Sequence, residues 1–344
     1  MPQRDIIVMG ASAGGVDGFR EIVGALPRDF AASIFIVLHI PSDSPSRLAA
    51  ILGRGAELPV SAARDRAPIQ KGHIYVAPPD HHLVLEPDMM RVVRGPRENR
   101  HRPAIDPLFR SAARAFGARV VGVLLSGLLD DGTNGLQVIH QSGGICVVQD
   151  PREAEFATMP HNAIEYDSPD SIMPVREIGP LLVKLASEGV PAKAAARRAS
   201  PELNEEVKVS EMKMDALEAE RAGKPSVFSC PECNGVLWEV QDLELGRFRC
   251  RVGHAYSGES LLTAKSEELE SALWGALRAL EESAAISRRM ADRAKKKGHT
   301  QSHTRLQHQA TEQQHQAAMV RDMLLRNGTS TAHTEVEAGT GTNG

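Results

Sequence analysis

The chain has 344 residues, of which 42% are hydrophobic and 24% charged, a composition typical of a globular protein with two or three folded units. Its 40 Lys plus Arg and 44 Asp plus Glu give a net charge of -4, so we expect no general binding to nucleic acid. No apolar run approaches the roughly 18 residues of a spanning helix, and the start, MPQRDIIVMG, enters a strand pattern without a signal-peptide layout. We therefore expect a cytoplasmic protein without membrane insertion.

Residues 1–188 alternate β-branched runs with helical patterns. This alternation predicts an α/β domain with a doubly wound, mostly parallel sheet and helices on both faces. Strands are expected at residues 6–9, 33–38, 73–77, 119–125 and 144–149. Helices are expected at residues 16–26, 44–53, 105–117, 133–141 and 177–188. Cys146 stands in the last of these strands and is expected in the core.

The first expected strand runs into GASAGG, with Ser12 at its centre, and then into a helix. This matches the G-x-S-x-G turn that exposes a nucleophilic serine. A glycine-rich phosphate loop at a helix N-terminus is compatible with the same six residues. A dinucleotide site, however, requires an acidic residue at the end of the next strand, and His39 stands there instead.

Asp130 and Asp131 follow a third strand and precede a glycine. Such a pair is common in ordinary turns. Because functional groups of a doubly wound sheet collect at the carboxyl ends of its strands, a carboxylate here could also orient His39 to take a proton from Ser12. The chain order Ser, His, Asp differs from the Ser, Asp, His order of α/β-hydrolases, which disfavours a lipase-type enzyme.

Six sequence blocks within residues 5–188 resemble the catalytic domain of CheB-type chemotaxis protein-glutamate methylesterases. The blocks are IIVMGASAGG, VLHIP, HIYVAPPDHH, RHRPAIDPLFRSAA, LLSGLLDDGTNG and GGICVVQDP. The resemblance implies a carboxylic ester hydrolase that removes methyl groups from γ-glutamyl methyl esters of methylated chemoreceptors, and often deamidates glutamine there, without a catalytic cofactor. Methylesterases of this type usually carry an N-terminal receiver domain. Here the first strand begins near residue 5, so we expect no receiver in this chain.

The same resemblance assigns site residues. It implies that Ser12 is the nucleophile, His39 the base and Asp131 the acid, with Asp130 standing where the family often has Asn. The oxyanion would be bound by backbone N–H groups of the Gly127–Leu128 turn and of Ala13. Ala13 stands where the family often has Thr, so any role of that hydroxyl is lost.

A basic run before the third helix contains Arg97, Arg100, His101 and Arg102. A solvated loop is the ordinary interpretation of such a run, but a positive rim would suit acidic receptor helices. Arg100, His101 and Arg102 are therefore candidate residues of the substrate cleft. A metal site at Asp80, His81 and His82, in the segment PDHH, is disfavoured because no further ligands are evident.

Cys230 and Cys233 are followed by Cys250 and His254 among short strand-like pieces. Tetrahedral zinc takes four sulfur or nitrogen ligands, and a full set leaves no open position, so we predict a structural Zn²⁺ in a zinc-ribbon-like module over residues 226–256. A polar linker is expected at residues 189–225. Because the Ser, His and Asp positions all precede residue 190, we expect the α/β domain to work independently of this module.

Apolar residues recur at helical spacing over residues 257–326, which predicts a helical hairpin able to self-associate. The tail at residues 327–344 is rich in Gly and Thr and is expected to be disordered. An alternative to the enzyme is a non-catalytic scaffold that binds receptor helices and recruits partners through the zinc module and the hairpin. The simultaneous presence of Ser12, His39 and Asp131 favours the enzyme.

Overall fold

The structure is a computed structural model that describes residues 2–41, 46–192, 208, 223–240 and 246–337, with side chains described as far as residue 326. The chain forms two compact units, Met1–Leu262 and Thr263–Gly344. No helix in the described part of the chain is both long and apolar enough to cross a membrane.

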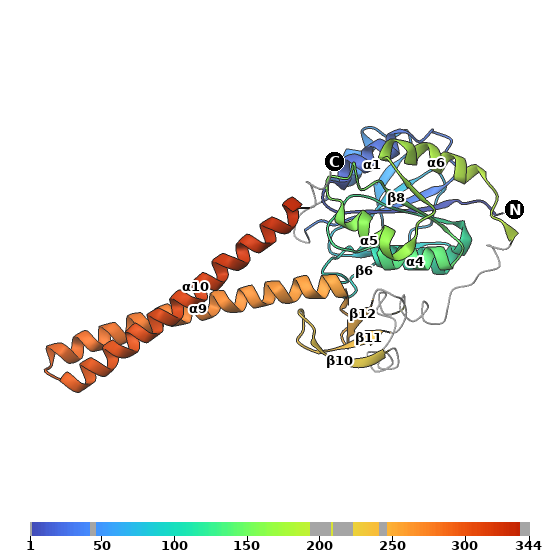
Figure 1. Cartoon of the computed structure of the whole chain (residues 1–344). Coiled ribbons are helices and arrows are strands. Elements are labelled where there is room, and N and C mark those ends of the chain that lie inside the picture. The colour runs from blue at the N-terminus through green and yellow to red at the C-terminus, as the bar shows by residue number, and fades with distance from the viewer. Residues whose placement is uncertain (1, 42–45, 193–207, 209–222, 241–245, 338–344) are drawn as a thin grey trace. The chain divides into compact units, whose positions relative to one another are not determined.

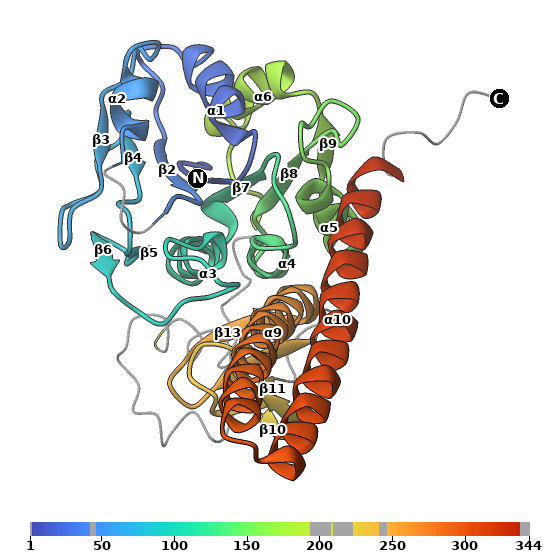
Figure 2. The same cartoon turned by 90° about the vertical axis from the view of Figure 1, so that its left-hand side faces the viewer.

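A seven-stranded parallel sheet in the order β3-β4-β2-β1-β7-β8-β9 forms the centre of the first unit (Figure 1, Figure 2). Its strands are β1 (Ile6–Ala11), β2 (Ser33–Leu38), β3 (Val60–Ala62), β4 (Ile74–Val76), β7 (Val120–Leu124), β8 (Ile145–Gln149) and β9 (Ser171–Met173). β1 lies in the middle of the sheet, between β2 and β7. The strands β2 to β4 lie on one side of β1, and the later strands β7 to β9 lie on the other side. The strand order therefore reverses beside β1, which makes this position the topological switch point, where ligands of doubly wound sheets bind.

Helices cover both faces of this sheet, as the sequence predicts (Figure 2). One face carries α1 (Gly15–Gly24), α2 (Leu48–Gly53) and α6 (Val175–Ser187), and the other carries α3 (Ile105–Phe116), α4 (Thr133–Gln141) and α5 (Thr158–Asp167). Successive side chains of a strand point to opposite faces, so Ile7 and Met9 pack on the α1 side while Ile6 and Val8 pack on the α3 side. Both faces of β1 are therefore apolar and buried.

Several short elements were not expected from the sequence. β3 and β9 have only three residues each at the two edges of the sheet, which is too short for a recognisable periodicity. α5 contains Pro160 in its first turn, a position where proline is tolerated. A hairpin of β5 (His82–Leu85) and β6 (Met90–Val93) packs beside α3.

The first unit also contains a four-stranded antiparallel sheet formed by β10 (Gly223–Ser229), β11 (Val236–Val240), β12 (Arg247–Cys250) and β13 (Ala255–Ser257). Its last strand makes a parallel bridge to the segment between β6 and α3, where Ala255 lies opposite Glu98. This part of the chain thus shares a buried interface with the α/β domain and belongs to the same compact unit, whereas the sequence predicts a separate module. Most of the expected linker, residues 193–207 and 209–222, lies outside the described residues.

The second unit contains α9 (Gly258–Lys296) from Thr263 onward and α10 (Thr300–Glu337), two long helices connected through Gly298 at a φ of 75°. Leu277, Ala317 and Leu324 form its buried contact. α10 continues into the segment expected to be a disordered tail. This segment contains no proline to stop the helix, and residues 338–344 lie outside the described residues.

Candidate active site

Ser12 and His39 lie directly beyond paired positions of adjacent strands. Ala11 ends β1 opposite Leu38, which ends β2, and the N–H of His39 donates to the carbonyl of Ala11 at 3.2 Å. On the other side of β1, the N–H of Ser12 donates to the carbonyl of Ser126, just after β7, at 3.0 Å. The ends of three adjacent strands therefore converge at Ser12, as their order in the sheet requires.

Asp131 reaches this point from the loop before α4 and is held by four hydrogen bonds. Its Oδ2 lies 2.7 Å from Nε2 of His39 and accepts from the N–H of Ile105 at 2.6 Å. Its Oδ1 accepts from Nδ2 of Asn99 at 2.9 Å and from the N–H of Asp106 at 3.4 Å. Burial alone would raise the pKa of this carboxyl, but the hydrogen bond from His39 and the other donors outweigh it and lower the pKa to about 2.

The ionised Asp131 fixes the tautomer of His39. A carboxylate only accepts hydrogen bonds, so Nε2 of His39 carries the proton. The His39 and Asp131 side chains are 4% and 2% exposed. Nδ1 of His39 is buried and has no hydrogen-bond partner among the described residues. This nitrogen therefore keeps a free lone pair and can accept a proton.

The three candidate cleft residues have different environments. The ring of His101 stacks on that of His39, with centroids 3.7 Å apart and planes 9° apart. Burial and the neighbouring His39 lower the pKa of His101 to about 3, so the ring is uncharged near neutral pH. The guanidinium of Arg102 binds Asp80 through two nitrogens, at 2.9 and 2.5 Å. Arg100, the third candidate, is half-buried and has a φ of 72°.

The turn after β7 packs against Ser12. A Cβ placed on Gly127 would lie 3.0 Å from Cβ of Ser12 and 2.5 Å from Cε of Met159, so a side chain there would displace Met159 and crowd Ser12. The N–H of Gly127 already donates to the carbonyl of Phe156 at 3.0 Å. Of the N–H groups expected to bind the oxyanion, those of Leu128 and Ala13 donate to no backbone carbonyl in the described chain.

The family described as CheB methylesterase matches residues 7–182 of the chain. This protein belongs to the CheB methylesterase family. A putative protein-glutamate methylesterase/protein-glutamine glutaminase of Leptospira interrogans is 38% identical over 182 residues, which cover 53% of this chain and 94% of the relative. Protein-glutamate methylesterase/protein-glutamine glutaminase 2 of Rhizobium johnstonii is 37% identical over 177 residues, and the match covers 50% of this chain and 48% of that relative.

A solved structure agrees with this membership. The crystal structure of the Thermotoga maritima CheB methylesterase catalytic domain superposes with a TM-score of 0.51 at 31% identity, covering 53% of this chain and 98% of that one. The family and the enzyme class predicted from the six sequence blocks are therefore confirmed. The match to the family ends at residue 182, so the Cys/His cluster and the long helices lie outside it.

The CheB methylesterase domain is joined to the antiparallel sheet at Asn99, a residue that the sequence analysis missed. Nδ2 of Asn99 donates to Asp131, and its Oδ1 accepts from the N–H of Ser257 at 3.0 Å. Neighbouring Glu98 binds Arg110 and Arg247, each at 2.6 Å. Both residues lie in the segment PRENRHR, which was interpreted only by its positive charges, so nothing in the sequence indicated that Glu98 and Asn99 make buried contacts.

Asp130 also belongs to this junction. Its Oδ1 accepts from the hydroxyls of Ser257 at 2.7 Å and Ser260 at 3.2 Å. Burial raises the pKa of Asp130 to about 6 despite these hydrogen bonds. Asp130 therefore faces the C-terminal part of the first unit, whereas Asp131 faces His39.

Cys230, Cys233, Cys250 and His254 come together as a cluster whose ligand atoms all lie within 4.8 Å of one another. The Sγ atoms of Cys233 and Cys250 are 3.6 Å apart, and Nδ1 of His254 lies 3.7 Å from Cys230 Sγ and 3.5 Å from Cys250 Sγ. Tetrahedral bonds of about 2.3 Å to sulfur and about 2.0 Å to nitrogen require separations of roughly 3.5 to 3.8 Å. The donor set and spacing fit a tetrahedral metal ion.

The disfavoured metal site around PDHH is not assembled. Asp80 binds Arg102, and His82 is buried with its ring nitrogens near the carbonyl of Pro96 and the N–H of Ala104. A second cluster of His140, Cys146 and Asp167 offers only three ligand atoms. Cys146 is fully buried in β8, as expected, and burial raises the pKa of its thiol.

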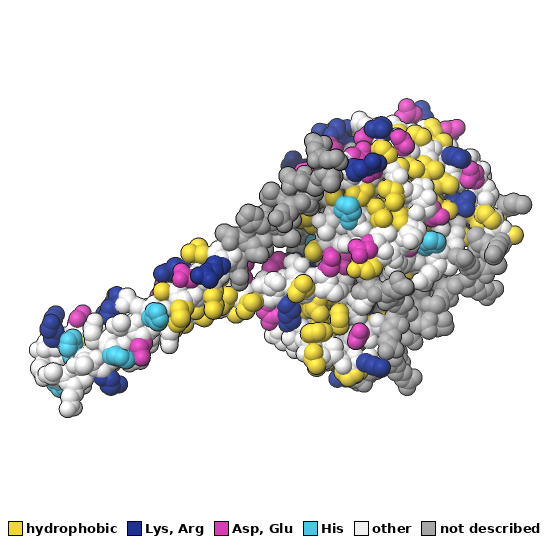
Figure 3. All heavy atoms as spheres, in the orientation of Figure 1, with side chains coloured by type: hydrophobic (Ala, Val, Ile, Leu, Met, Phe, Trp, Pro, Cys, Tyr) yellow, Lys and Arg dark blue, Asp and Glu magenta, His cyan; other side chains and the backbone are white. Residues whose placement is uncertain are grey.

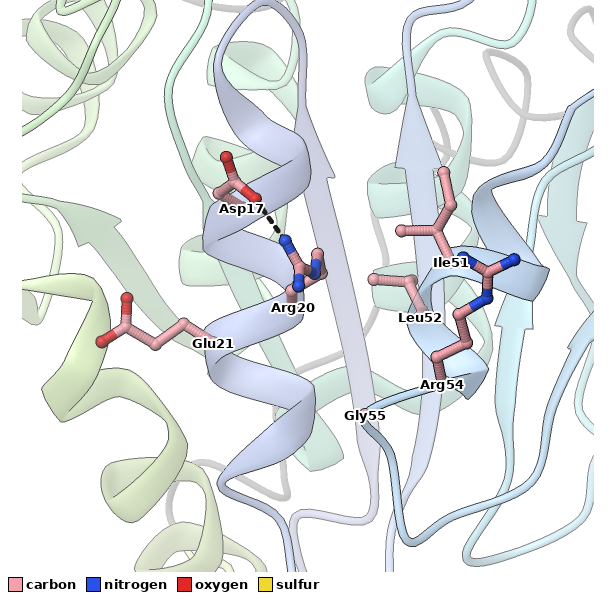
Figure 4. A pocket seen from close by; sticks show the side chains of 7 residues that line it. All are labelled: Asp17, Arg20, Glu21, Ile51, Leu52, Arg54 and Gly55. Atoms are coloured by element: carbon pink, nitrogen blue, oxygen red, sulfur yellow. Dashed lines mark hydrogen bonds and ion pairs between the residues drawn. The ribbon is translucent and has the colours of Figure 1, made fainter.

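A surface hollow of about 630 Å³ lies between α1 and α2 (Figure 4). It is lined by Asp17, Arg20, Glu21, Ile51, Leu52, Arg54 and Gly55. Arg20 donates to Asp17 at 2.9 Å on the same helix. No residue of the predicted catalytic set lines this hollow, so it does not mark the reaction centre.

Proposed function

We propose that this chain is a protein-glutamate methylesterase that hydrolyses γ-glutamyl methyl esters on methylated chemoreceptors, with Ser12, His39 and Asp131 as its catalytic residues. The observation that carries the proposal is the buried His39–Asp131 pair at 2.7 Å, whose other ring nitrogen is unpartnered at the strand end next to Ser12. Family membership supports the same chemistry.

The proposed reaction proceeds through an acyl-enzyme. Oγ of Ser12 attacks the ester carbonyl while Nδ1 of His39 takes the hydroxyl proton. The N–H groups of Leu128 and Ala13 bind the negative oxygen of the tetrahedral intermediate. His39 then protonates the leaving methoxide, methanol departs, and water repeats the steps to release Ser12 and a free glutamate. With a glutamine substrate, ammonia would leave in place of methanol.

Asp131 and His101 prepare His39 for this role. The ionised Asp131 keeps the proton on Nε2 and stabilises the imidazolium that forms when Nδ1 becomes protonated. His101, whose pKa is lowered to about 3, provides a neutral ring against the face of His39 and fixes its plane. A binding scaffold would have no use for a buried, oriented base, which disfavours the non-catalytic alternative.

We also propose that Cys230, Cys233, Cys250 and His254 hold a structural Zn²⁺. Two tight turns present the ligands: the N–H of Asn234 donates to the carbonyl of Cys230 at 2.8 Å, and the N–H of Gly253 donates to that of Cys250 at 2.9 Å. Four protein ligands fill a tetrahedral ion, so the metal would supply folding energy rather than catalysis.

Release of methanol tests the proposed activity. Purified full-length protein is incubated in the presence of the methylated cytoplasmic region of a chemoreceptor, beside a Ser12→Ala control. The proposal expects methanol from the wild type and none above background from Ser12→Ala. Equal release from both would remove Ser12 as the nucleophile, and no release from either would exclude this receptor as a substrate.

A further inference from the structure

A chain of hydrogen bonds leads from the candidate base to the antiparallel sheet. His39 binds Asp131, Asp131 accepts from Nδ2 of Asn99, and Oδ1 of Asn99 accepts from the N–H of Ser257. Asn99 is 6% exposed, so water does not replace these partners readily. Nδ2 of Asn99 also donates to Oδ2 of Asp106 at 3.1 Å. Rotating the amide would turn its oxygen toward the carboxylates of Asp131 and Asp106 and leave the buried N–H of Ser257 without its acceptor, which is unfavourable.

The backbone of this segment is held by β13. The N–H of Asn99 donates to the carbonyl of Ala255 at 2.8 Å, and the N–H of Ala255 donates to the carbonyl of Arg97 at 3.2 Å. Asn99 and Arg100 have φ values of 47° and 72°, in the left-handed region that residues with a side chain seldom adopt. Such a conformation persists where surrounding contacts impose it, and β13 provides those contacts.

A buried ion-pair group provides a second connection. Glu98 is 1% exposed and lies between Arg110 of α3 and Arg247 of β12. Both guanidinium groups also lie within 3.5 Å of Oδ1 of Asn134, at the start of α4. The loop that carries Asn99 is thus fixed from β12 as well as from β13.

The Cys/His cluster fixes the two strands that make these contacts. Cys250 is the last residue of β12, and His254 immediately precedes β13. The N–H of Cys250 donates to the carbonyl of His254 at 2.9 Å, which closes the turn between the strands. A metal ion bound to both side chains would hold this turn, and with it the position of β13 against Asn99.

We propose that the Cys/His module completes the catalytic site: when its metal is bound, β13 fixes Asn99, and Asn99 acts as a positioning residue that holds Asp131 in the orientation His39 needs. This inference rests on the proposed function of Ser12, His39 and Asp131. It assigns the module a role in turnover instead of a separate structural role.

Three full-length variants and the wild type test the proposal by methanol release from methylated receptor. Asn99→Ala removes the positioning amide, Cys233→Ser removes one metal ligand, Glu232→Gln serves as a matched control, and the wild type is the reference. Glu232 also connects this sheet to the loop, through Arg97 at 3.3 Å, but that pair is partly exposed and contributes little. The number of competent serines in each sample is measured by titration with an organophosphonate.

Because the base is misoriented, turnover per titrated serine is expected to fall by roughly tenfold to hundredfold in Asn99→Ala and in Cys233→Ser. In Glu232→Gln it is expected to stay within about twofold of the wild type. KM is expected to change little, since none of these residues is proposed to contact substrate. A purely structural role would lower the titrated fraction and leave turnover per site unchanged. That outcome would overturn the proposal.

A proton NMR measurement separates this inference from the proposed function. The short His39–Asp131 hydrogen bond is expected to give a downfield resonance in the wild type. This resonance should shift or disappear when a chelator removes the metal, and also when Asn99 is substituted. Adding Zn²⁺ back to the metal-free wild type should restore the resonance. An unchanged resonance overturns the inference even if the protein releases no methanol, whereas absent turnover with a metal-sensitive resonance overturns only the proposed function.

Discussion

Replacing Asp131 by asparagine should lower the turnover number by about a thousandfold to ten-thousandfold, the loss known for the matching change in serine-protease triads. The carboxylate accepts two hydrogen bonds on each oxygen, from His39 and Ile105 on Oδ2 and from Asn99 and Asp106 on Oδ1. An asparagine has one accepting oxygen, so its NH₂ group must face donors on one of the two sides.

The consequence for His39 follows from this geometry. If the new NH₂ faces the ring, Nε2 must become the acceptor and the proton moves to Nδ1, which then cannot take the proton of Ser12. The expected loss corresponds to about 4 to 5.5 kcal/mol of transition-state stabilisation. Steady-state methanol release, with the sites counted by phosphonate titration, measures it. An Asp131→Asn protein that keeps more than a tenth of wild-type turnover would refute the assignment of Asp131 as the acid.

Three further predictions concern the junction and the metal. Because the folded-state pKa of Asp130 is raised to about 6, the native protein binds an extra proton between about pH 4 and pH 6, and stability is lost as pH rises through this window, by up to about 3 kcal/mol. Asp130→Asn keeps the accepting oxygen but cannot ionise, so its free energy of unfolding, measured by chemical denaturation, should fall less with pH than that of the wild type. An equal fall in both proteins would contradict the raised pKa of Asp130. Wild-type protein purified without chelator should contain one zinc per chain. The Cys233→Ser protein should contain well below one, and protease should cleave its residues 223–257 more readily. A wild type without metal would contradict the proposed metal site. Truncation after residue 192 should lower turnover per titrated serine by at least about tenfold, and full activity of the truncated domain would show that the module is dispensable.

The parallel sheet and the convergence of its strand ends were predictable because their signals are local. β1, β2 and β7 are largely apolar runs that are buried along their whole length, a pattern typical of strands covered on both faces. Ser12, His39 and Asp131 each follow one of these runs. Since the carboxyl ends of parallel strands meet at one edge, their proximity follows from the order of the strands.

The junction was not predictable because its partners are distant and carry no periodic signal. Asn99 and Ser257 are 158 positions apart, and the left-handed backbone of Asn99 depends on a strand that forms later in the chain. The environment of Arg102 was also not predictable, because its partner is distant in the sequence. Its charge alone suggested a positive rim of the cleft, but its guanidinium binds the side chain of Asp80, 22 positions away. Tertiary contacts of this kind decide which charges remain exposed.

Methanol release from a methylated chemoreceptor fragment, compared between equal amounts of folded wild type and Ser12→Ala, decides whether this chain is the proposed esterase. We expect catalytic release by the wild type and background release by the variant, since Oγ of Ser12 is the proposed nucleophile. Ser12→Ala that releases methanol at the wild-type rate would contradict this assignment.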